Sequence, residues 1–146
     1  MYSNPYEAQI EQQVLSADPI ELVALVLEHL IRSIADARRQ LASGDRAARA
    51  KSISKALGLL AELSQTLDDE RGGEVAHNLR RIYGFVANCL VQAQSRQLER
   101  PLKDAMQALA PLCDAWKTLC NTRLEVLGPM PMASGIDASV RLALHA

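Results

Sequence analysis

Apolar residues recur along most of the chain at alternating intervals of three and four, the spacing that places side chains on one face of a helix. The first such segment follows Asp18-Pro19, an N-cap carboxylate and a proline suited to the first helical position, and Gly44 is its expected C-terminal stop. Its predicted buried positions are Val23, Leu27, Leu30, Ile34, Ala37 and Leu41. The pattern predicts a long helix between Asp18 and Gly44.

The second segment follows Asp45, which is a suitable N-cap. Its predicted buried positions are Ala50, Ile53, Leu57, Leu60, Ser64 and Leu67, with Leu59 and Leu63 widening the face. The polar run that begins at Asp68 ends in Gly72-Gly73, and paired glycines leave a helix easily. We therefore expect the second helix to end at this run.

Two more segments repeat the spacing. The third has its predicted buried positions at Val75, Leu79, Ile82, Val86, Cys89 and Ala93. The fourth begins near Pro101, reaches about Leu127 and buries Leu102, Met106, Leu109, Cys113, Trp116 and Cys120. Pro111 lies inside the fourth segment, so a kink or local break is expected there.

Four segments of matched length joined by short links must run antiparallel to their neighbours. The sequence therefore predicts an all-α protein, an antiparallel up-down four-helix bundle over residues 18–127. Residues 1–17 carry Tyr6, Ile10 and Val14 at intervals of four, which predicts a short helix or arm. Residues 128–146 open with Gly-Pro-Met-Pro and are expected to form a flexible tail.

Charge and composition narrow the class of function. Sixteen Lys and Arg residues against seventeen Asp and Glu give a formal net charge of −1, so the chain lacks the basic field that nucleic-acid binding needs. No apolar stretch approaches the roughly 20 residues of a membrane span, and the start of the chain lacks the pattern of a signal peptide. We expect a cytoplasmic protein that neither binds nucleic acid nor inserts into a membrane, and whose three cysteines pack as buried thiols.

Candidate catalytic chemistry is sparse. The most suggestive motif is Glu74-Val75-Ala76-His77, because helical bundles hold di-iron sites with paired Glu-x-x-His motifs. A second such motif is lacking, and the predicted buried positions leave Glu74 and His77 beside the core. The sequence therefore predicts no catalytic residues, no metal site, no cofactor and no enzyme activity. A metal-dependent bundle enzyme remains an alternative.

Two of the helical segments carry more apolar residues than a bundle seam uses, which is about three in seven. The first has seven apolar residues close together, namely Leu22, Val23, Leu25, Val26, Leu27, Leu30 and Ile31. The third has a second row formed by Leu79, Tyr83, Val86 and Leu90. Surplus apolar surface marks a site for a partner or for self-association. A homodimer, or cover by the N-terminal arm, explains it equally well.

Four motifs follow one another along residues 4–120. They are Asn4-Pro5-Tyr6-x-Ala8, then Ala17-Asp18-Pro19-x-Glu21-Leu22-Val23, then Leu67-Asp68 with Gly72-Gly73-Glu74-Val75-Ala76-x-Asn78-Leu79-x-x-Ile82-Tyr83, and finally Leu109-x-x-Leu112-x-x-Ala115-Trp116. In this order and spacing they resemble motifs of the flagellar secretion chaperone family, FliS. One departure is Leu25-Val26-Leu27-Glu28-His29, where that family often has M-L-Y-D-G.

The resemblance implies a helical bundle that holds the disordered C-terminal segment of flagellin, prevents its premature polymerisation and aids its delivery to the flagellar export apparatus. It also makes the export apparatus and other flagellar proteins candidate partners. Together with the surplus apolar rows it makes Leu25, Leu79, Tyr83, Val86 and Leu90 candidate contacts for flagellin, although burial in the bundle's own core is an equal alternative for each.

The two terminal segments are candidates for covering the same surface. Tyr6 and Ile10 of the arm are expected to cover a groove when flagellin is absent. The tail has Ile136, Val140 and Leu144 at helical spacing, so it is a second candidate occupant of the groove.

Overall fold

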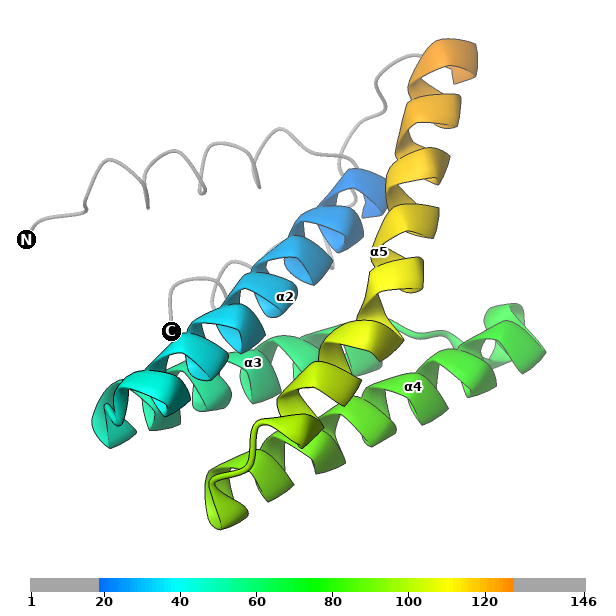
Figure 1. Cartoon of the computed structure of the whole chain (residues 1–146). Coiled ribbons are helices and arrows are strands. Elements are labelled where there is room, and N and C mark those ends of the chain that lie inside the picture. The colour runs from blue at the N-terminus through cyan, green and yellow to red at the C-terminus, as the bar shows by residue number, and fades with distance from the viewer. Residues whose placement is uncertain (1–18, 128–146) are drawn as a thin grey trace, which may run out of the picture.

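The computed structural model describes residues 19–127, which form α2 (Pro19–Ser43), α3 (Arg46–Gln65), α4 (Asp69–Arg96) and α5 (Arg100–Leu127) (Figure 1). No strand occurs within this range. The predicted helix start near Pro101 is confirmed, because α5 begins at Arg100. The predicted start at Pro19 and the predicted end at Leu127 fall at the limits of the described residues. The N-terminal arm, with Tyr6 and Ile10, and the tail over residues 128–146 lie outside the described residues.

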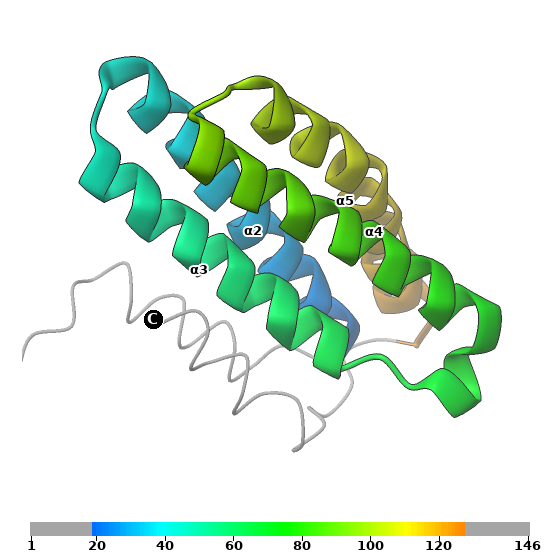
Figure 2. The same ribbon diagram turned by 90° about the horizontal axis from the view of Figure 1, so that it is seen from below.

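The four helices form an antiparallel bundle, which confirms the predicted all-α fold. α2 packs against α3 and α5, and α4 packs against the same two helices. Figure 2 shows α3 and α4 in one layer, with α2 and α5 behind them. The largest fully buried side chains come from all four helices: Leu22, Val26, Leu27, Leu30, Ile34, Leu59, Val86, Leu90, Leu102 and Leu109.

The link between α2 and α3 uses the predicted stop and start residues. Gly44 has a positive φ of 77°, which favours glycine, and its N–H donates to the Leu41 carbonyl at 3.3 Å. The Asp45 N–H donates to the Gln40 carbonyl at 3.0 Å, which completes a Schellman cap. The Asp45 carboxylate in turn accepts from the Ala48 N–H at 3.1 Å and starts α3.

The link between α3 and α4 differs from the prediction. The Asp68 carboxylate accepts from the N–H groups of Glu70 and Arg71, so α4 begins one helical turn earlier than the glycines suggested. Gly73 then interrupts the helix with φ 50° and ψ −123°. The predicted burial of Val75 is wrong, because its side chain is 66% exposed just after this kink.

Pro111 lies inside α5, as the sequence indicated. Proline has no N–H to donate to the Gln107 carbonyl, and its ring crowds that carbonyl, so the helix bends rather than continues straight. Figure 1 shows the axis of α5 turning between its yellow-green lower part and its yellow and orange upper part. The bend directs the upper part of α5 away from α4.

The core positions of α3 are shifted from those predicted. Ile53, Leu59, Leu60 and Leu63 are buried as expected, whereas Ala50, Leu57, Ser64 and Leu67 are only partly buried. The additional buried positions are Ala56 and Arg49. Arg49 is 3% exposed, and its Nε donates to Oε1 of Gln94 on α4 at 3.1 Å. The burial of Arg49 could not be predicted, because the helical pattern is read from apolar residues only.

Cys89, Cys113 and Cys120 are buried thiols and are not joined in disulfides, as the sequence predicted. Burial raises the pKa of the Cys89 and Cys113 thiols, which keeps both uncharged at neutral pH. Among the helices from Pro19 to Leu127, none is long and apolar enough to cross a membrane.

Candidate functional site

The bundle opens at the end where α4 begins and α5 finishes. There the bend in α5 carries its upper part away from α4 (Figure 1). Val75 is 66% exposed and Leu79, one helical turn further along α4, is only half-buried. On α5, Leu119 is 45% exposed and follows the half-buried Leu112 and Trp116 by seven and three residues. This spacing puts the three α5 side chains on one face of the helix.

An apolar cleft lies at this open end, with a volume of about 210 Å³. We use the name apolar cleft for the hollow lined by Ile20, Val23, Thr66, Leu67, Leu79, Tyr83 and Trp116. These residues come from α2, α4, α5 and the α3–α4 link, so the cleft forms only in the folded bundle.

Two hydroxyl groups line the apolar cleft, those of Thr66 and Tyr83. The Thr66 Oγ1 donates to the Leu63 carbonyl at 2.7 Å. Tyr83 is 3% exposed, and loss of solvent around it raises the pKa of its hydroxyl to about 12. Neither lining group carries a charge at neutral pH. The apolar cleft therefore favours an aliphatic or aromatic occupant over a charged one.

A second depression runs between α2 and α5. It consists of two adjoining hollows of about 270 and 350 Å³ that share Glu28 and Lys117. We call it the α2–α5 groove, and it is lined by Glu21, Ala24, Leu25, Glu28, Ile31, Arg32, Ala110, Cys113, Asp114, Lys117, Cys120 and Asn121. Unlike the apolar cleft, it carries acidic and basic side chains on both walls.

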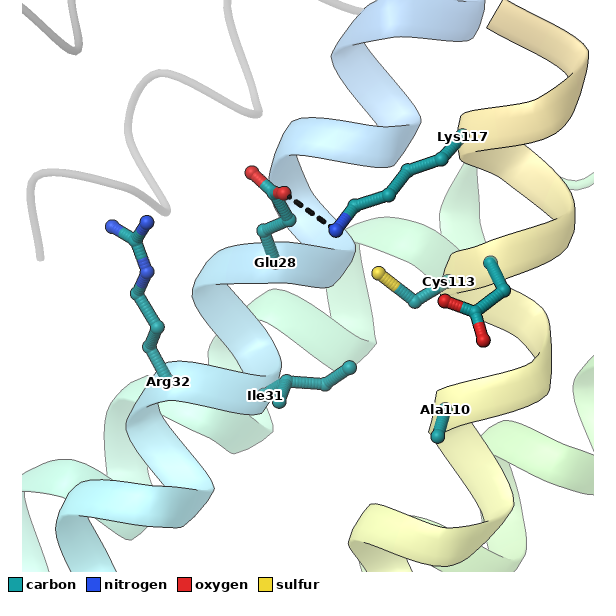
Figure 3. A pocket seen from close by; sticks show the side chains of 7 residues that line it. Glu28, Ile31, Arg32, Ala110, Cys113 and Lys117 are labelled. Atoms are coloured by element: carbon teal, nitrogen blue, oxygen red, sulfur yellow. Dashed lines mark ion pairs between the residues drawn. The ribbon is translucent and has the colours of Figure 1, made fainter.

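An ion pair joins the two walls of the α2–α5 groove. Lys117 Nζ lies 3.0 Å from Glu28 Oε1, and Figure 3 shows the two side chains pointing toward each other. The hydrogen bond to Glu28 raises the pKa of Lys117. In the same view Ile31 and the Cys113 sulfur point into the space between the helices, while Arg32 points away from α5. The α2–α5 groove thus combines apolar side chains with an ion pair that joins its two walls.

His29 follows Glu28 on α2 and lines neither depression. Its side chain is buried, and desolvation, aided by the positive charge of Arg32, lowers its pKa to about 4. The imidazole is therefore neutral at neutral pH. Of the residues that depart from the family pattern, Leu27 and His29 thus lie in the packed interior, whereas Leu25 and Glu28 line the α2–α5 groove.

The structure separates the predicted contact residues into three groups. Leu79 and Tyr83 line the apolar cleft, and Leu25 lines the α2–α5 groove. Val86 and Leu90 are fully buried in the core, the alternative that the sequence left open for them. Neither is accessible to a partner while the bundle keeps this packing. Tyr6 and Ile10 lie outside the described residues.

Sequence reasoning missed three surface features of the open end and one of the α2–α5 groove. Val75 was assigned to the core, because periodicity does not show that a helix extends past its neighbours. Trp116 was assigned to the core alone, yet it also lines the apolar cleft. Leu119 was not singled out, although its spacing from Leu112 and Trp116 was readable in the sequence. The ion pair between Lys117 and Glu28 could not be predicted, because the sequence does not show that α5 faces α2.

The part of the chain from residue 19 to residue 127 contains no group of three or more His, Cys, Asp or Glu side chains that could hold a metal ion. Glu74 and His77, the pair considered for such a site, are both exposed at the start of α4. What the two depressions offer is apolar contact surface, with one ion pair beside it.

Comparison of the sequence with known proteins identifies the family of the chain. Residues 2–123 match the model of the family described as flagellar protein FliS. The chain belongs to the FliS family. A flagellar secretion chaperone FliS from Salmonella typhimurium is 30% identical over 77% of this chain and 84% of its own length. The Pseudomonas aeruginosa flagellar secretion chaperone FliSB is 34% identical over 70% and 81%, and the Bacillus subtilis FliS chaperone is 26% identical over 78% and 84%.

The FliS match includes every residue that lines the apolar cleft and the α2–α5 groove, because it runs to residue 123. Both depressions therefore belong to the part of the chain shared with this family of flagellar secretion chaperones.

Proposed function

We propose that this protein is a cytoplasmic, non-enzymatic chaperone that binds the disordered C-terminal segment of flagellin, prevents its premature polymerisation and aids its delivery to the flagellar export apparatus. Membership of the FliS family supports the role, and the names of the relatives support the flagellar secretion pathway. The observation that carries the proposal is the apolar cleft, together with two exposed side chains near its lining residues in sequence: Val75, one helical turn before Leu79, and Leu119, three residues after Trp116.

The binding mode that fits this surface is an amphipathic helix laid into an apolar cleft. A disordered client must become ordered on binding, which costs about 2–5 kcal/mol. At about 25 cal/mol per Å² of apolar surface, burial of roughly 80–200 Å² offsets that cost. Val75, Leu79 and Leu119 offer surface of this kind beside the cleft, because none of them is fully buried by the bundle.

The α2–α5 groove provides a second contact for the same client. Leu25 and Ile31 supply apolar surface on its α2 wall, and the Glu28–Lys117 ion pair crosses between them. A partly exposed ion pair adds little affinity but favours one orientation of a bound chain. Flagellin is thus proposed to be held mainly by the apolar cleft and oriented by the groove.

The test is calorimetry with a peptide from the C-terminus of the same organism's flagellin, with a pair of matched variants. Val75→Asp places a carboxylate one helical turn before the lining residue Leu79, where binding of the client would desolvate it. We expect the affinity for the peptide to fall by about tenfold or more, which corresponds to about 1.4 kcal/mol. The heat-capacity change of binding to the unchanged protein should be negative, because apolar surface is buried.

Val91→Asp is the control. Val91 lies on the same helix and is 54% exposed, but Asn88 and Ser95 beside it are exposed too, so it faces outward. Its replacement should leave peptide affinity unchanged. Equal affinity of both variants and the parent would remove the apolar cleft as the site. Absence of any binding by the parent protein would reject flagellin as the client, and sedimentation would then test the alternative, a homodimer closed through the same surface.

A further inference from the structure

A segment of this chain lies beyond the part shared with the FliS family. The family match ends at residue 123 and the structure describes α5 as far as Leu127, whereas the sequence continues to residue 146. Gly128, Pro129 and Pro131 follow α5 directly, and this composition does not continue a helix. The remaining residues therefore form a separate unit of sequence attached to the open end of the bundle.

Residues 134–146 have the pattern of an amphipathic helix. Ile136, Val140 and Leu144 recur every four residues and so share one face of a helix, whereas Leu142 falls on the opposite face. Ser134 precedes Asp137 by three residues, the spacing of a capping box at a helix start. A short helix with one apolar face is the kind of ligand that fits the apolar cleft.

The segment is long enough to reach the cleft. Trp116 lies eleven residues before Leu127, which corresponds to about 17 Å along α5 at 1.5 Å per residue. The nine residues from Leu127 to Ile136 span up to about 30 Å when extended. The chain can therefore turn back along α5 and place Ile136 at the cleft without moving the bundle.

We propose that residues 134–146 dock as a helix in the apolar cleft and occupy it when flagellin is not bound. The inference rests on the function proposed above, since the segment would compete with the client for the same surface. The apolar face of Ile136, Val140 and Leu144 covers Leu79 and Trp116 and meets Val75 and Leu119. A tethered segment acts at an effective concentration in the millimolar range, so weak contacts are sufficient.

This competition has a calculable effect on client binding. The apparent affinity for a client falls in proportion to the fraction of molecules whose cleft is open. If the docked segment closes the cleft in nine molecules of ten, flagellin binds about tenfold more weakly than it would to an empty cleft. The segment then covers the apolar surface while no client is bound, and a client of higher affinity displaces it.

Two full-length variants test the proposal. Ile136→Asp with Val140→Asp removes the apolar face, whereas Leu142→Asp introduces the same charge on the opposite face. Trp116 lines the cleft and is the only tryptophan in the chain, so its fluorescence reports on cover of the cleft directly. We expect the double variant to increase acrylamide quenching of Trp116 and to raise the affinity for the flagellin peptide by about three- to tenfold. Leu142→Asp should change neither.

A substitution on α5, three residues after the lining residue Trp116, provides the reciprocal test. Leu119→Asp should increase Trp116 quenching by itself, and combination with the segment variant should add nothing, because both changes break the same contact. Unchanged Trp116 quenching in the double segment variant would overturn the inference, whatever the flagellin peptide does. If quenching rises but no form of the protein binds the peptide, the segment docks as proposed and the client assignment fails instead.

Discussion

The two ends of the bundle are built differently. At the end formed by the α2–α3 and α4–α5 links, contacts cross between helices: Arg38 pairs with Glu99 at 2.8 Å, and Arg49 donates to Gln94. At the opposite end, α4 and α5 are 28 residues long whereas α3 has 20, so the longer helices extend past their neighbour. Eight residues of helix correspond to about 12 Å. Arg80 also links α4 to the end of α3 there, through the Ser64 carbonyl. The ends differ in that only the open one leaves Val75 and Leu119 exposed.

The largest expected effect separates the ends by stability. Leu102 near the start of α5 is fully buried at the end formed by the α2–α3 and α4–α5 links. Leu102→Ala should lower the free energy of unfolding by about 2–5 kcal/mol, because it leaves a cavity in the packed core. Val75→Ala at the open end should change it by less than about 0.5 kcal/mol. Urea unfolding followed by circular dichroism measures both. Similar losses for the two variants would mean that the ends do not differ as described.

Acid provides a way to lower the stability of the bundle through His29, a buried residue in the middle of α2. The pKa of His29 is lowered to about 4 in the folded protein, against 6.5 for an unperturbed histidine. The unfolded chain therefore binds a proton between these two values that the folded chain does not, and stability falls as the pH drops from about 6.5 toward 4. The loss should reach up to about 3 kcal/mol.

Urea unfolding of the parent and of His29→Gln at pH 7 and pH 4.5 measures this term. The variant should lose less stability between the two pH values than the parent. An identical pH dependence in both proteins would show that His29 is not the titrating group. The experiment also sets a baseline for client binding, because a loss of affinity that follows His29 reflects the bundle rather than the apolar cleft.

The smallest expected effect concerns the ion pair across the α2–α5 groove. Glu28 and Lys117 are both partly exposed, so water and salt weaken their attraction. Lys117→Met should leave the urea midpoint almost unchanged. The same variant should alter the salt dependence of flagellin-peptide binding, measured by calorimetry at two ionic strengths, if the groove orients the client. A large fall in stability would instead assign the pair a structural role.

Much of the fold could be predicted from the sequence, because each helix carries its own signals. Asp45 and Gly44 act through local hydrogen bonds, and Leu27 or Leu109 is buried because its position in the helical repeat faces the core. The kink at Gly73 was not predicted, since the cap formed by Asp68 competes with the glycines and only the structure shows the outcome.

The site was harder to predict than the fold. Leu79, Tyr83 and Leu25 were chosen from apolar rows, and they do line depressions. Val86 belongs to the same row but is fully buried, because a neighbouring helix covers one part of the row and not the other. Helical periodicity identifies a face; it does not tell where the covering helix stops. That information depends on the relative lengths of α3, α4 and α5.

The proline in α5 has a further consequence for this open end. The bend at Pro111 follows from the ring of the residue itself, not from any bound molecule, so the divergence of α5 from α4 is present as soon as the chain has folded. A ligand that arrives need not push two helices apart. The binding surface is thus preorganised by the covalent structure of one residue, and most of the entropy lost on binding is that of the ligand.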